Sequence, residues 1–145
     1  MSLLKALLIF GMISYTPVAE LPSSDSSLRE TLPVELSFEK MARNKARPKR
    51  AAVAEKHQIT VTGSMAAPTP CHGLQGSVVK KGTDLLLEVA PKSNAGKGIS
   101  CAAVITEFSY HAIIRDLEPG RYHLEVRHKF LEEGRPALQQ ELELK

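Results

Sequence analysis

The chain of 145 residues is long enough for one domain with a tail. Its formal charge of +3 is unevenly placed: residues 40–56 carry seven basic side chains and one acidic one, whereas residues 57–145 carry ten of each. The basic character therefore belongs to one short segment, and a basic DNA-binding face on the domain is not indicated. That segment has no aromatic residue to stack on bases, which argues against single-stranded nucleic acid as a partner.

The first 19 residues have the pattern of a secretory signal peptide. A single lysine is followed by fourteen uncharged residues, and the strongly apolar part, Ala6–Ile13, is too short to span a bilayer. We predict export to the periplasm, cell surface or extracellular space, with cleavage after Ala19. The alternative is a free amphipathic N-terminus on a cytosolic protein.

Residues 20–56 are predicted to form a disordered basic linker. The stretch LPSSDSSLRETLP is polar and contains two prolines, which favours an extended, solvated chain. Within the linker, residues 36–46 are expected to form a short helix that ends before Pro48. Three apolar residues on its face are too few to stabilise this helix in isolation.

The basic run within this linker admits three interpretations. The sequence RPKR, with Arg47, Lys49 and Arg50, has the form that proprotein convertases cut, and cleavage would release residues 51–145. The run also suits electrostatic contact with anionic lipid or a polyanionic cell surface. A solvated linker whose charges keep it extended is the favoured interpretation.

From His57 onward, apolar residues recur at every second position, which is the period of a half-buried strand. Turn sequences separate seven such runs at intervals typical of an all-β sandwich. Residues 57–145 are therefore predicted to form a seven-stranded antiparallel β-sandwich of the immunoglobulin or fibronectin type III kind. The expected strands are 57–63, 72–80, 84–90, 101–106, 109–116, 121–129 and 137–144.

The segment DLEPGRYHLEV carries Leu117, Pro119, Gly120 and Tyr122 and resembles the tyrosine corner of these sandwiches. In that motif, the tyrosine hydroxyl bonds back to the backbone where the chain crosses between sheets. The chain has no tryptophan, and position 124 is leucine where antibody domains have a cysteine. These two departures favour a fibronectin-like sandwich over a true antibody domain.

The same half of the chain resembles a group of small exported bacterial single-domain proteins. The likeness rests on a TPTPC start, a later cysteine and an L-x-P-G-x-Y segment. No activity is assigned to that group, so the resemblance implies architecture and export. The residues that carry it are Pro68, Thr69, Pro70, Cys71, Cys101, Leu117, Pro119, Gly120 and Tyr122.

Cys71 and Cys101 are predicted to form a disulfide, because two cysteines in an oxidising compartment most simply pair with each other. Closing a loop of this length stabilises a fold by roughly 3–4 kcal/mol. The alternative is two buried thiols in a cytosolic protein. A catalytic pair of Cys71 and His72 is disfavoured because neighbours on a strand point to opposite faces.

No cofactor or metal is expected. The five histidines, His57, His72, His111, His123 and His128, lack the spacing that puts two imidazoles on one face, and they are interpreted as ordinary exposed residues. Glu141 and Glu143 share a solvent-facing side of the last strand without a base beside them. The segment NAGKGIS departs from the phosphate-loop pattern and is interpreted as a flexible loop.

These observations predict a non-catalytic binding or structural module whose partner is a protein or a cell-surface polymer. The expected contact surface is the loop 91–100 with outward residues of two strands, and Ile113 is a further outward apolar position. One alternative is a secreted inhibitor or factor released after Arg50, and another is a metal- or thiol-dependent protein. The predicted contact residues are Leu86, Lys97, His123, Glu125 and Arg127.

Overall fold

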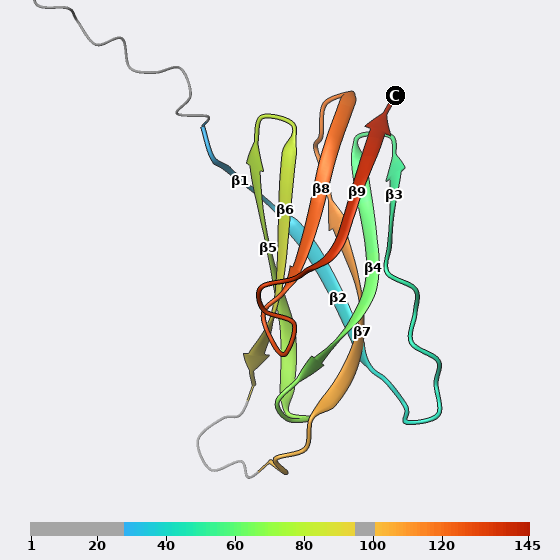
Figure 1. Ribbon diagram of the computed structural model, residues 1–145, viewed down its shortest axis with the longest axis vertical. Coiled ribbons are helices and arrows are strands. Elements are labelled where there is room, and N and C mark those ends of the chain that lie inside the picture. The colour runs from blue at the N-terminus through green and yellow to red at the C-terminus, as the bar shows by residue number, and fades with distance from the viewer. Residues whose placement is uncertain (1–27, 95–100) are drawn as a thin grey trace, which may run out of the picture.

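The computed structural model describes residues 28–94 and 101–145, which form an all-β fold of two facing sheets (Figure 1). The predicted signal peptide and Lys97 lie outside these residues. One sheet has five strands in the order β1-β5-β6-β8-β9, and the other has four in the order β2-β7-β4-β3. The described ranges contain no helix, and hence none that is long and apolar enough to cross a membrane. The strands are β1 (Glu30–Leu32), β2 (Val34–Lys40), β3 (Ala51–Glu55), β4 (Gln58–Ala67), β5 (His72–Lys81), β6 (Asp84–Ser93), β7 (Thr106–Ile114), β8 (Gly120–His128) and β9 (Pro136–Leu144).

The core lies between the sheets and is built by the inward side of each alternating strand. Side chains at every second position are buried, and those between them face outward, as the period of two predicts. Burying these apolar side chains is the main favourable term in folding. They include Ile59, Val61, Val78, Leu85, Leu87, Val89, Tyr110, Ala112, Ile114, Leu124 and Val126.

The pairing of the strands differs from the predicted antiparallel arrangement of seven. The described residues form nine strands, and β6 runs parallel to β8, with Leu86 opposite Glu125. The chain leaves the five-stranded sheet after β6, passes through β7 in the other sheet, and returns as β8 in the original direction. The strand predicted over 101–106 is absent because residues 101–105 are not paired and β7 begins at Thr106.

The prediction of a disordered linker with a helix over 36–46 is wrong for residues 30–40 and 51–55, which form strands of the sandwich. β1 pairs with β5, and β2 pairs with β7 in the other sheet, so one extended segment changes sheets at Pro33 (Figure 1). Val34, Leu36 and Phe38 alternate with polar residues and follow the strand period. The fold therefore begins before residue 57, and the segment covers one open side of the sandwich.

A side-chain bridge spans the opposite side, where the edge strands β3 and β9 approach each other. The amide of Gln140 donates to the carbonyl oxygen of Ala52 at 2.9 Å, and its oxygen accepts from the Ala52 N–H at 3.4 Å. The amide thus occupies the place of a neighbouring strand at this point, which satisfies backbone groups that an edge leaves unpaired.

The turn into β8 has the contact that defines a tyrosine corner. The hydroxyl of Tyr122 donates to the carbonyl oxygen of Glu118 at 2.7 Å. Leu117 is buried at the end of the core, and its backbone N–H donates to His57 in the β3–β4 turn. Gly120 has a φ of 151°, a conformation that residues with a Cβ rarely adopt. The chain crosses between the two sheets at this corner.

Candidate binding cleft

A disulfide joins the two sheets at the end of the sandwich opposite the tyrosine corner. Cys71 immediately precedes β5, and Cys101 belongs to the unpaired segment that leads into β7. Their Cα atoms are 6.1 Å apart, which is within the range that a disulfide requires. Pro70 and Ala102, each adjacent to one of the cysteines, lie in the wall of a cleft. The disulfide therefore fixes part of that cleft.

The cleft has a volume of about 440 Å³ and lies between the loop after β2 and the segment before β7. Among the residues that the structure describes, its lining contains one carboxylate, that of Glu107. Apolar side chains of Val104 and Ile105 form part of the same wall. The basic side chains that line it are Lys40, Arg43, Lys45 and Arg47.

Backbone and side-chain bonds hold the basic loop in place, although the sequence predicted a solvated linker. The N–H of Met41 donates to the carbonyl oxygen of Glu107 at 2.9 Å, and the N–H of Lys45 donates to Ala42 at 3.0 Å. The Arg47 guanidinium pairs with the Glu107 carboxylate at 2.9 Å. The loop presents its charges in a defined position against the sandwich.

The cleft is electropositive because its charges are unbalanced. Glu107 is paired with Arg47, and within the described ranges Lys40, Arg43 and Lys45 form no ion pair. Three cations close together raise the local concentration of anions and favour an anionic ligand. This arrangement can bind a phosphate or carboxylate group.

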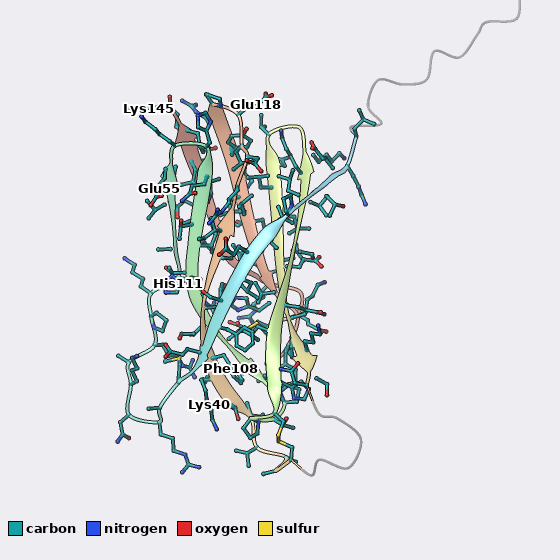
Figure 2. All side chains as sticks on the ribbon, turned by 180° about the vertical axis from the view of Figure 1, so that it is seen from behind. Lys40, Glu55, Phe108, His111, Glu118 and Lys145 are labelled. Atoms are coloured by element: carbon teal, nitrogen blue, oxygen red, sulfur yellow. A yellow bond between two sulfur atoms is a disulfide. The ribbon has the colours of Figure 1, made fainter. Side chains whose placement is uncertain are left out.

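Two smaller hollows continue the cleft along the outer face of the four-stranded sheet. A hollow of about 220 Å³ shares Met41 and Lys45 with the cleft, and a third of about 210 Å³ shares Ser109 and His111 with the second. Lys40 marks the loop end of this path, and His111 lies further along the sheet (Figure 2).

The predicted contact residues that the structure describes are brought together elsewhere, on the outer face of the five-stranded sheet. The parallel pairing of β6 with β8 puts Leu86 opposite Glu125, and His123 and Arg127 lie on the same face. Arg127 donates to Glu125 at 2.7 Å. This surface lies on the opposite sheet from the basic cleft, so the two are separate candidates.

The predicted processing sequence lies at the end of the basic loop. Arg47 is paired with Glu107, Lys49 is exposed, and Arg50 bonds to Glu132 at 2.5 Å and to the Ala137 carbonyl at 3.5 Å. β3 begins at the next residue. Cleavage after Arg50 would break the covalent connection between β1 and β2 and the strands with which they pair.

A buried polar network, which the sequence analysis missed, lies beside this loop. The hydroxyl of Tyr110 is 2.7 Å from Nε2 of His128, and Nδ1 of His128 is 2.7 Å from Glu132, which also binds Arg50. The interpretation of all histidines as exposed is wrong for His128, whose side chain is 0% exposed. Position 128 continues the inward series 122, 124 and 126, so the strand period contained the signal.

The environment of this network favours a neutral imidazole. Burial lowers the pKa of His128, although the hydrogen bond to Glu132 acts in the opposite direction. Burial raises the pKa of Tyr110 to about 12. Partial burial acts to raise the pKa of Glu132, but the hydrogen bonds from Arg50 and His128 outweigh it and lower that pKa. We assign Nδ1–H as the donor to Glu132 and Nε2 as the acceptor from Tyr110.

The structure also shows the surroundings of the cysteines and histidines that were considered as catalytic or metal-binding residues. His72 bonds to the Thr69 hydroxyl at 2.7 Å within its own turn, and both cysteines are in the disulfide. In the part of the chain that the structure covers, no three His, Cys, Asp or Glu side chains gather closely enough to hold a metal ion. Comparison of the chain with protein-family models, curated proteins and solved structures finds no match.

Proposed function

We propose that this protein is an exported, non-catalytic binding module that holds an anionic group of its partner in the basic cleft. The proposal rests on the position of Lys40, Arg43 and Lys45, which line one cleft. The carboxylate of Glu107 in the same cleft is already paired with Arg47. A folded loop binds more tightly than a flexible one because less conformational entropy is lost. The favoured ligand chemistry is phosphate or carboxylate.

Export is supported by the N-terminal pattern and by the disulfide, which is compatible with an oxidising compartment. Kinship with immunoglobulin or fibronectin type III-like sandwiches is supported by the tyrosine corner and by the adjacency of β6, β8 and β9. The position of β5 beside β6 in one sheet and the parallel pairing of β6 with β8 both depart from that topology. We therefore propose a variant of that architecture.

The test is a titration of the disulfide-bonded protein with inorganic tripolyphosphate, followed by amide chemical shifts. Shifts are expected to concentrate in residues 40–47 and 102–107. The double variant Arg43→Glu/Lys45→Glu should lose binding by about 25-fold or more, at about fivefold for each basic residue, because two attractive charges become repulsive.

The matched control is Lys81→Glu/Arg121→Glu, which makes the same charge change at the other end of the sandwich. Lys81 and Arg121 are exposed and lie near the tyrosine corner. This variant should retain binding at the cleft. Equal loss in both variants would show that net charge alone attracts the anion and would contradict a defined site.

A further inference from the structure

Two exposed aliphatic side chains stand at the lip of the basic cleft. Val104 is 50% exposed and Ile105 is 58% exposed, and both line the hollow together with Arg43 and Lys45. Single exposed aliphatic residues are common and need no explanation. Here two consecutive aliphatic residues lie beside three cations that form no ion pair within residues 28–94 and 101–145, so apolar and positive surface meet in one place.

The segment that carries this pair is held firmly. The N–H of Val104 donates to the carbonyl oxygen of Ala102 at 2.8 Å, and the Thr106 hydroxyl donates to the carbonyl oxygen of Val104 at 3.0 Å. The disulfide at Cys101 fixes its other end. The two side chains are therefore presented to solvent by an ordered backbone.

Both parts of this surface lie at one end of the molecule. Lys40 marks this end in Figure 2, and Glu55, Glu118 and Lys145 mark the opposite end. The cleft wall is built by the loop after β2 and the segment before β7, beyond the ends of several strands. A flat partner can contact this end while both sheet faces stay free.

We propose, building on the anion-binding function above, that this end of the sandwich docks on an anionic phospholipid bilayer. Lys40, Arg43 and Lys45 attract the headgroups, and Val104 and Ile105 enter the boundary between headgroups and acyl chains. A soluble polyanion would use the cations and leave both aliphatic side chains in water. An anionic bilayer has negative headgroups for the cations and apolar acyl chains for the aliphatic pair. We therefore assign a bilayer as the partner.

The expected strength is moderate and depends on salt. Each basic residue near an anionic surface contributes about fivefold to binding, so three contribute on the order of a hundredfold. Part of this attraction is lost when salt screens the charges. The aliphatic pair adds a contribution that salt does not weaken.

The test is co-sedimentation of the disulfide-bonded protein with two kinds of vesicle. One contains phosphatidylcholine alone, and the other also contains phosphatidylglycerol. Binding is expected only to the second. Val104→Ser/Ile105→Ser should weaken vesicle binding about tenfold, because it removes apolar surface while keeping every charge of the cleft.

The matched control is Val53→Ser, which removes an aliphatic side chain that is 57% exposed on β3, away from the cleft. It should bind vesicles as the parent does. As a second measurement, a spin label in the acyl chains should broaden the methyl signals of Val104 and Ile105 in the unaltered protein. This readout does not depend on the folding of a variant.

The outcomes separate the two proposals. Tripolyphosphate binding without vesicle binding would overturn the bilayer assignment, retain the anionic cleft and point to a soluble polyanion. Failure to bind either would overturn both. Vesicle binding that is equally strong without Val104 and Ile105, or methyl signals that stay sharp, would overturn the insertion of the aliphatic pair.

Discussion

The hydroxyl of Tyr110 on β7 lies 2.7 Å from Nε2 of His128 on β8, and this bond joins the two sheets through the core. The network continues through Glu132 to Arg50, the last residue before β3. Arg50 also ends the loop that forms one wall of the basic cleft. The core thus anchors both the cleft loop and the β8–β9 connection.

The stability of the fold should fall as the pH drops below about 6.5, because of His128. Its pKa in the folded protein is lower than in the unfolded chain, so the unfolded chain takes up the proton first. The free energy of unfolding therefore decreases from about pH 6.5 down to the folded pKa, by at most about 1.4 kcal/mol for each pH unit. Urea unfolding at several pH values measures this slope.

The variant His128→Gln should show a shallower slope over that pH range, whereas His111→Gln should keep the parent slope. His111 is exposed on the outer face of the four-stranded sheet and touches none of the network. The ring signals of His128 in the parent protein supply a check that needs no substitution. An imidazole that gains its proton at or above pH 6.5 would contradict the prediction.

Gly63→Ala should destabilise the fold by about 1–3 kcal/mol, the usual cost of overfilling a packed core. A Cβ at position 63 would lie 2.9 Å from the Tyr110 hydroxyl and 3.1 Å from the adjoining ring carbon. Tyr110 is 2% exposed and bonded to His128, so a shift of its ring would disturb both the core packing and that hydrogen bond. Thermal or urea unfolding measures the loss.

Gly76→Ala is the matched control, since position 76 also lies in a strand but its nearest neighbour would be 3.5 Å away, at ordinary contact distance. We expect a clearly smaller effect there. If both substitutions cost the same, the loss would come from the backbone of the strands and not from Tyr110.

Removal of the disulfide should lower the free energy of unfolding by roughly 3–4 kcal/mol, because the unfolded chain regains the freedom of a closed loop. Cys71→Ser/Cys101→Ser should also weaken tripolyphosphate binding, since Pro70 and Ala102 would no longer be held in the cleft wall. Urea unfolding and the same titration measure the two effects. An unchanged unfolding curve would contradict this prediction.

Local features of this protein could be predicted from the sequence. The strand period identified the buried side of β4, β6 and β8, because alternation along one strand depends only on that strand. The same rule applied to Val34, Leu36 and Phe38 predicts β2, and applied to position 128 it predicts a buried histidine. Two cysteines leave only one intramolecular pairing, which the structure contains.

The tertiary structure alone decided which strands pair and which distant residues meet. The parallel pairing of β6 with β8 and the change of sheet at Pro33 depend on contacts between segments far apart in the chain. The polar network is a further example. Arg50 precedes β3, Tyr110 and His128 lie on strands of different sheets, and Glu132 lies in the β8–β9 connection. A strand's period records which side is buried but not which neighbour buries it. For the same reason, the basic run was visible in the sequence as charge, and only the fold made it one wall of a cleft.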